Sequence, residues 1–249
     1  MSNQQEIIDL QNEFGERGRF TTTELANFFK KNRAEISAKA IHWKIHTLKT
    51  NDVISSLGRG LYQWKKGEEK QTKNEFEGKL TAAERALFAK IKAKYPLIQV
   101  CIWQVRWLHE FMTHLPSVSW TLVEVDKDVS ESVFSLLRNS RHDVYFNPNR
   151  ATMEHQLAYD RKAVIVKDLI SQAPLTQSKG VPCPVLEKVI VDLCIDKAVF
   201  DIYQGSELRN IMSEIFRRHQ INLSRLKRYA TRRNAWDRIS EIIEEAMEN

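Results

Sequence analysis

The sequence predicts a protein of the α+β or α/β class: an N-terminal winged helix-turn-helix, then a small mixed β-sheet domain with a helical C-terminal region. Three observations lead to this prediction. Three amphipathic stretches and a two-stranded hairpin fill the first 66 residues. After a charged segment, β-rich runs alternate with stretches of helical periodicity. From about residue 185 onward, all of the remaining stretches have helical periodicity.

The bulk composition restricts the class of protein. The 249 residues carry a formal net charge of +6, which is compatible with nucleic-acid binding but does not establish it. No apolar run is long enough to span a bilayer, and the N-terminus lacks the pattern of a signal peptide. Cys101, Cys183 and Cys194 lie far apart, which argues against disulfides and zinc. We therefore expect a reduced, cytoplasmic protein without a metal, a cofactor or a membrane segment.

Three helices are predicted in the first 50 residues. In the second, Thr21 and Glu24 have the spacing of a capping box, in which a hydroxyl and a carboxylate each bind a free backbone amide. The third helix runs from about Ser37 to Thr50. Its expected core stripe consists of Ala38, Ile41, Ile45 and Leu48.

A hairpin follows the third helix, with "VISS" and "LYQW" on either side of the tip "LGRG". Gly58 and Gly60 allow the positive φ angles that a tight turn needs, and they leave Arg59 without bulky neighbours. In a winged helix the third helix enters the major groove and the wing lies over the adjacent backbone. Arg59 is therefore expected to contact phosphate or the minor groove.

The predicted DNA-binding surface surrounds the third helix. Lys39 and His46, opposite the core stripe, have side chains that donate to phosphates or base edges. The alternative for both is a plain solvated face. Trp43 either stacks on the nucleic-acid backbone or packs against the linker or second domain. The predicted DNA-binding residues are Arg33, Ser37, Lys39, Trp43, His46, Thr47 and Arg59.

The rest of the chain is expected to form a second domain. We place a winged-helix domain at residues 1–66, a charged linker at 67–79 and the second domain at 80–249, with its helical part at about 185–249. Thr81 and Glu84 repeat the capping-box spacing at the start of this domain. Strands are expected at 97–105, 119–126, 142–148 and 162–169, and helices at 80–95, 106–115 and 130–139.

Catalytic motifs are missing from the sequence, which carries no GxSxG, HExxH, P-loop or GxGxxG pattern, so we expect no enzyme. Glu124 and Asp126 lie on one face of a predicted strand, where two carboxylates could hold Mg²⁺ as in nucleases of restriction-enzyme-like architecture. Such sites usually carry a lysine two residues after the acid, at the position of Asp126 here. The alternative is that both acids only end the strand at the rim of the sheet.

A cationic stretch, "FRRHQINLSRLKRYATRRN", has no acid between Arg217 and Asn234. It is either a solvated helix paired to the acidic C-terminal "EIIEEAMEN", or a docking surface for an acidic partner or nucleic acid. The predicted partner-binding residues are Arg217, Arg218, Arg225, Arg228, Arg232 and Arg233.

These stretches together resemble the AbiEi-like antitoxins of type IV toxin–antitoxin and abortive-infection systems. The resemblance spans nearly the whole chain and rests on "GRGLYQW", on "WLHEFM" before "VEVD", on "VYFNP" with "AVIVKDL", and on "PVLEKVIVDLCID" with "NLSRLKRYATRRN". The patterns "LEK…DL…D" and "RYA.RR" are its most specific part. It implies a winged-helix domain that binds double-stranded DNA at its own operator, and a second domain, including the cationic stretch, that neutralises a cognate nucleotidyltransferase-type toxin.

Two other functions stay open from the sequence. One is a magnesium-dependent nuclease guided by the winged helix, with Glu124 and Asp126 as metal ligands. The other is a ligand-sensing transcription factor, which would need a substantial apolar pocket in the sheet domain.

Overall fold

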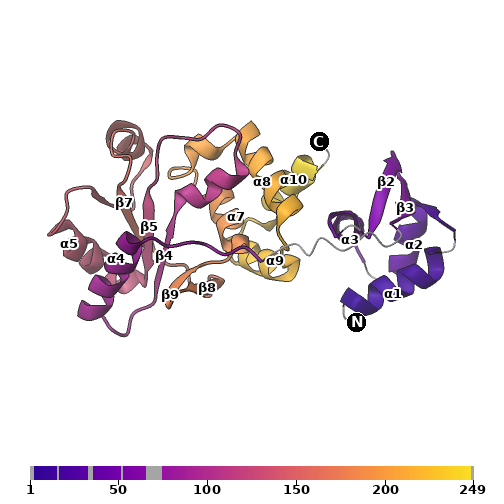
Figure 1. Cartoon of the computed structure of the whole chain (residues 1–249), viewed down its shortest axis with the longest axis horizontal. Coiled ribbons are helices and arrows are strands. Elements are labelled where there is room, and N and C mark those ends of the chain that lie inside the picture. The colour runs from indigo at the N-terminus through magenta and orange to yellow at the C-terminus, as the bar shows by residue number, and fades with distance from the viewer. Residues whose placement is uncertain (1–2, 16, 33–35, 52, 66–74, 248–249) are drawn as a thin grey trace. The chain divides into compact units, whose positions relative to one another are not determined.

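The computed structural model describes residues 3–15, 17–32, 36–51, 53–65 and 75–247 (Figure 1). The chain divides into two compact units, Met1–Lys73 and Asn74–Asn249, and each is described by itself. Both units combine helices with sheets, which confirms the α+β class. Arg33 and most of the expected linker lie outside the described residues.

The first unit has the arrangement of a winged helix. Helices α1 (Asn3–Phe14), α2 (Thr22–Asn32) and α3 (Ala38–Thr50) precede the hairpin of β2 (Ile54–Gly58) and β3 (Leu61–Trp64). The short strand β1 (Arg19–Thr21), which we did not expect from the sequence, pairs with β3, so the antiparallel sheet has the order β1-β3-β2.

The core of the first unit follows the predicted pattern with one exception. Ile41, Ile45 and Leu48 of α3 are buried, but Ala38, the first residue of the helix, is exposed. The expected capping box is present at the start of α2. The amide of Thr21 donates to Glu24 Oε2 at 2.8 Å, and the amide of Glu24 donates to Thr21 Oγ1 at 3.2 Å. These bonds satisfy amides that a helix N-terminus otherwise leaves free.

A mixed sheet forms the centre of the second unit. Its strands are β4 (Val100–Gln104), β5 (Thr121–Val125), β6 (Val144–Phe146) and β7 (Val164–Asp168), in the order β4-β5-β7-β6. β4 pairs antiparallel with β5, and the other two pairings are parallel. Each of these strands lies within a predicted β-run. Every residue of β4 and β5 is buried, as expected for strands covered on both faces.

Helices cover both faces of this sheet (Figure 1). α4 (Ala82–Lys94) and α5 (Ser130–Arg138) lie on one side, and α7 (Leu186–Ile195) lies on the other. α4 begins with the expected capping box of Thr81 and Glu84. The predicted helix at 106–115 is a 3₁₀ helix, Val105–Phe111.

The second unit also contains elements that the sequence pattern did not predict. β8 (Leu175–Ser178) and β9 (Val181–Pro184) form a hairpin, and a helical segment covers α6 (Arg150–Thr152) and the following π-helical turn Met153–Leu157. Pro182 and Pro184 make β9 hard to recognise in the sequence, because proline has no backbone N–H for strand pairing.

The C-terminal region is helical, as predicted. It contains α7, a 3₁₀ turn (Asp201–Tyr203), α8 (Ser206–Arg218), α9 (Leu223–Arg232) and α10 (Trp236–Met247). The three cysteines are unpaired and buried. Within the described ranges, no helix is both long and apolar enough to cross a membrane.

The second unit begins earlier than the sequence suggested. The ring of Phe76 lies 5.7 Å from that of Trp107 and 6.0 Å from that of Phe111. Gly78 is buried, and a Cβ at this position would lie 2.1 Å from Trp107 Cη2. The placement of 67–79 in a solvated linker is therefore wrong at its C-terminal end, because Phe76 and Gly78 pack against the second unit.

Candidate functional site

The N-terminal turn of α3 carries two of the predicted DNA-binding residues. Ser37 is the N-cap, and its hydroxyl oxygen accepts a hydrogen bond from the amide of Ala40 at 3.2 Å. This bond explains why α3 begins here, and it gives Ser37 a structural role whether or not it meets DNA. Lys39, the second residue of the helix, is exposed.

The middle of α3 carries Trp43, His46 and Thr47, which are all half-buried. The rings of Trp43 and His46 lie 6.3 Å apart in an edge-to-face arrangement. The hydroxyl of Thr47 donates to the carbonyl of Trp43 at 2.8 Å. Its proton is therefore used within the helix, which weakens the interpretation of Thr47 as a donor to DNA.

The tip of the wing presents Arg59 to solvent between β2 and β3. The flanking Gly58 and Gly60 have φ angles of +153° and +72°, so the turn uses backbone conformations that favour glycine. The carbonyl of Gly60 accepts a hydrogen bond from the amide of Thr22 at 2.9 Å. The turn behind Arg59 is thus tied to the first residue of α2.

Other cations of α3 have different environments. His42 and Lys49 are exposed on the side of the helix that carries Lys39, at the spacing i, i+3, i+10, and neither is among the DNA-binding residues predicted from the sequence. Lys44 instead forms an ion pair with Glu6 and lies 5.0 Å from the centre of the Phe29 ring. The basic side chains available to a ligand on α3 therefore include Lys39, His42 and Lys49.

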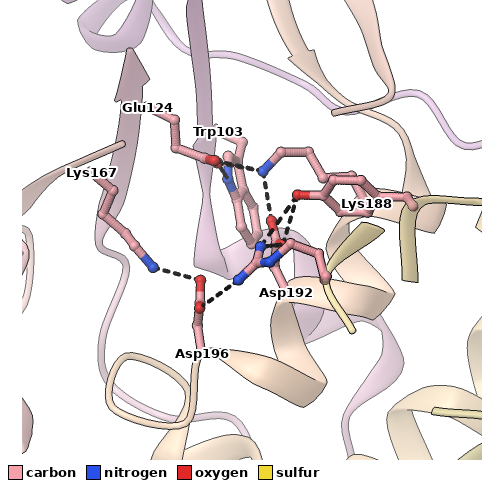
Figure 2. A network of polar contacts seen from close by, with 8 residues as sticks. Trp103, Glu124, Lys167, Lys188, Asp192 and Asp196 are labelled. Atoms are coloured by element: carbon pink, nitrogen blue, oxygen red, sulfur yellow. Dashed lines mark hydrogen bonds and ion pairs between the residues drawn. The ribbon is translucent and has the colours of Figure 1, made fainter. Parts of the chain in front are cut away.

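A buried polar network lies between the sheet and the C-terminal helices of the second unit (Figure 2). Lys188 Nζ lies 2.7 Å from both carboxylate oxygens of Glu124 and 2.6 Å from Asp192 Oδ2. Trp103 Nε1 donates to Glu124 Oε1 at 3.0 Å. All four residues are buried, so the network joins β4 and β5 to α7 without contact with water.

The network continues from Asp192 to α9 and β7. Asp192 Oδ1 accepts hydrogen bonds from Tyr229 at 3.1 Å and from Arg233 Nη1 at 2.8 Å. Arg233 Nη2 donates to Asp196 Oδ1 at 3.1 Å, and Lys167 Nζ donates to Asp196 Oδ2 at 2.5 Å. Carboxylates and cations alternate along the whole chain of contacts, so each buried charge has a partner of opposite sign.

The electrostatics of the network favour the charged forms of Lys188 and Asp196, whereas burial raises the pKa of Asp192. Burial alone would lower the pKa of Lys188, but Asp192 and Glu124 outweigh burial and raise it well above its ordinary value. Burial would raise the pKa of Asp196, yet Lys167 and Arg233 hold it below its ordinary value. Burial raises the pKa of Tyr229, so its phenol stays neutral. Lys188 and Tyr229 are therefore not poised to exchange protons near neutral pH.

The structure corrects the interpretation of Glu124 as an acid at the rim of the sheet. Glu124 is buried under α7 and bound to Lys188, whereas Asp126 accepts a hydrogen bond from the amide of Gln99 at 2.8 Å. Among the described residues, no three His, Cys, Asp or Glu side chains are placed to hold a metal ion. The geometry gives no support to the magnesium site considered from the sequence.

The cationic stretch does not form one common surface. Arg233 points into the buried network, so its assignment to a docking surface is wrong. Arg217 and Arg218 both bind Glu214, and their hydrogen bonds lower the pKa of Glu214 to about 2. Glu214 belongs to α8 itself, and Arg233 binds Asp192 of α7 and Asp196, which follows α7 directly. None of these three acids belongs to the acidic C-terminal tail that the sequence suggested as the partner.

The remaining arginines are on α9. Arg225 Nη1 lies 3.6 Å from Glu187 Oε2, and Arg232 binds the side chains of Ser171 and Gln172. Arg228 is exposed. The exposed part of the predicted docking surface on α9 thus centres on Arg228 and Arg232.

The residues that carry the most specific sequence patterns meet in space. "LEK…DL…D" supplies Lys188, Asp192 and Asp196, and "RYA.RR" supplies Tyr229 and Arg233. One signal for this was available in the sequence. Lys188 and Asp192 are four residues apart in a helix whose only other polar residue is Glu187, a spacing at which opposite charges pair.

The chain thus combines a winged-helix unit with an α+β unit whose sheet and helices are joined by buried ion pairs. Residues 40–249 match the family described as "Family of unknown function (DUF6577)". Because the match covers most of the chain, the protein belongs to this family. A comparison with curated proteins found no match for the chain.

Proposed function

We propose that the protein is a DNA-binding transcriptional autoregulator that reads duplex DNA with α3 and the β2–β3 wing. The observation that carries this proposal is the exposure of Lys39 on α3 and of Arg59 at the wing tip, within a unit of winged-helix arrangement. In this fold class the third helix lies in the major groove and cations around it neutralise phosphates. Such a role places the protein in the cytoplasm.

We also propose that the second unit acts as an antitoxin against a nucleotidyltransferase-type toxin. The support is the resemblance to AbiEi-like antitoxins, whose most specific patterns here belong to residues of the buried network. The expected contact surface includes the exposed Arg228 and Arg232 of α9 and leaves out Arg233, which is bound to Asp192 and Asp196. Co-expression with the product of an adjacent nucleotidyltransferase-like gene tests this: Arg228→Glu and Arg232→Glu should abolish protection from growth arrest.

DNA binding is tested by a mobility shift with the DNA upstream of the protein's own reading frame. The wild-type protein should prefer this DNA to a scrambled duplex, and Lys39→Ala and Arg59→Ala should each weaken binding by roughly 1 kcal/mol or more. Lys94→Ala, at an exposed position of α4 in the second unit, is the matched control. Unchanged affinity in the first two variants would show that the surface is wrong, and equal binding to both duplexes would exclude the regulator.

The nuclease receives less support from the geometry. Both oxygens of the Glu124 carboxylate are occupied by Lys188, which neutralises the charge that a Mg²⁺ ion would need. Divalent-metal-dependent cleavage of duplex DNA that is lost in Glu124→Gln would nevertheless establish it in place of the regulator.

A further inference from the structure

A surface pocket of about 480 Å³ lies within the second unit. Its walls come from the segment after α7, the 3₁₀ turn Asp201–Tyr203 and the residues that follow it, the first turn of α8 and one face of α10. The pocket is also lined by Arg150 of α6, and its charged side chains are Arg150, Lys197, Asp201, Arg209, Arg238 and Glu245. Cations from four separate segments of the chain thus converge on one hollow.

Three of these cations are exposed and have no charged partner among the described residues. Within the described part of the chain, the side chains of Lys197, Arg209 and Arg238 make no ion pair or hydrogen bond. Arg150, by contrast, donates to Glu154 at 2.7 Å and lies 4.0 Å from Asp201. Like charges that converge in this way repel one another, so the arrangement disfavours the empty pocket and favours an anion in it.

The cations of the pocket differ from those of the cationic stretch in their partners. There, Arg217, Arg218, Arg225 and Arg233 are engaged by carboxylates of the protein itself. The pocket arginines come from different places in the sequence, and only the fold brings them together. A pattern search along the chain could not find this group.

The backbone at the pocket supports the same conclusion. Gly205 lines the pocket and is the N-cap of α8, with a φ angle of +69°. Because glycine has no side chain, the free amides of the first turn receive no side-chain cap. The partial positive charge of this helix end adds to that of Lys197, Arg209 and Arg238.

The other walls restrict the kind of anion. Leu208 and Ile242 supply apolar surface, and Asp201 and Glu245 supply carboxylates that accept hydrogen bonds from hydroxyl groups. The volume lies within the range of pockets that hold small organic ligands. We propose that this pocket binds a small phosphate ester of the size of a nucleoside monophosphate, with the phosphate on the cations and sugar hydroxyls on the carboxylates.

Isothermal titration of the full-length protein at low salt with AMP, UMP, ribose 5-phosphate and inorganic phosphate tests the proposal. At least one of the esters should bind with one-to-one stoichiometry and more tightly than inorganic phosphate. Arg209→Gln and Arg238→Gln should each weaken this binding by about tenfold or more, because each removes a charge-assisted hydrogen bond. Lys94→Gln, which removes an exposed cation of α4 outside the pocket, should leave it unchanged. Circular dichroism checks that each variant is folded, and Lys197→Gln replaces a variant that is not.

Several results would overturn the proposal. These are a lack of saturable binding by any ester up to about 10 mM, affinity unaffected by the pocket substitutions, or inorganic phosphate binding as tightly as the esters. Displacement of the ester by a single-stranded oligonucleotide of higher affinity would assign the cations to nucleic acid instead. None of these outcomes depends on whether the winged helix binds operator DNA.

Discussion

Lys188 of α7 holds both carboxylate oxygens of Glu124 on β5 at 2.7 Å, in a part of the second unit that solvent does not reach. The two residues are 64 positions apart in the sequence, so this pair fixes a helix of the C-terminal region against the central sheet. A buried pair of this kind contributes little net stability over an apolar pair, but loss of one partner leaves an uncompensated charge.

Lys188→Met is therefore expected to destabilise the protein by roughly 3–5 kcal/mol, because it leaves Glu124 and Asp192 without their shared cation. Urea unfolding measured by circular dichroism gives the change in the free energy of unfolding. Lys94→Met, at an exposed position of α4, is the control and should change it little. The double variant Lys188→Met with Glu124→Gln should recover part of the loss, and a loss as large as the sum of the single variants would contradict the pairing.

The pH dependence of stability should include a contribution from Asp196. Its pKa in the folded protein lies below the ordinary value, since Lys167 and Arg233 outweigh the effect of burial. A group with a lowered folded pKa stabilises the protein above its unfolded pKa of about 3.9, and that contribution disappears as the pH falls through the folded pKa. Asp196→Asn should flatten the decline of the free energy of unfolding between about pH 5 and pH 2. If the free energies of unfolding of the wild type and Asp196→Asn change with pH in parallel, Asp196 contributes nothing to the pH dependence of stability.

The cysteines should be unreactive in the folded protein. Burial raises the pKa of Cys183 to about 11 and that of Cys194 to about 12, and it also raises that of Cys101 well above its ordinary value. Because the thiolate is the nucleophile, a thiol reagent such as dithionitrobenzoate at pH 8 should react slowly with the native chain. In the denatured protein all 3 cysteines should react at once, with release of 3 equivalents of thionitrobenzoate. Rapid reaction of native protein would mean that at least one thiol is accessible.

Much of the first unit could be predicted from local patterns. Periodicity located the buried Ile41, Ile45 and Leu48, and the glycines around Arg59 located the wing tip, because both depend on neighbours a few residues away. The strand β1 was missed because three residues carry no periodicity. The strand β9 was missed because its prolines contradict a strand pattern.

The buried network and the pocket could not be predicted in the same way. Trp103, Glu124 and Lys188 come from three elements, and their contact depends on how β4 pairs with β5 and where α7 packs. Arg233 was assigned to the surface because its neighbours in the sequence are cationic, yet its position on α9 turns it toward Asp192. Sequence reveals the charges of such groups, whereas tertiary packing decides which of them meet.

The packing of Gly78 against Trp107 gives a test of where the second unit begins. A Cβ at residue 78 would lie within 2.1 Å of the indole, so Gly78→Ala forces the ring to move. We expect a loss of about 1–3 kcal/mol in the free energy of unfolding, as for other overpacked cores. In a protein that already carries Trp107→Leu, adding Gly78→Ala should cause little further loss in the free energy of unfolding, because leucine leaves room for the new Cβ. Additive losses, or no loss in Gly78→Ala, would show that the segment is not held there.

The wing gives the sharpest test of the proposed DNA contact. If Arg59 neutralises one phosphate, the logarithm of the operator binding constant should fall less steeply with the logarithm of salt concentration in Arg59→Ala, by a slope of roughly one. Arg59→Lys keeps the charge on the same exposed turn and should retain the slope, although it loses any geometry specific to guanidinium.

Lower affinity with an unchanged slope in Arg59→Ala would mean that the substitution disturbs the turn between Gly58 and Gly60 instead of removing a phosphate contact. An unchanged slope together with unchanged affinity would place Arg59 outside the interface, and the DNA contacts would then have to come from α3, with Lys39 and its exposed neighbours His42 and Lys49 as the next positions to substitute.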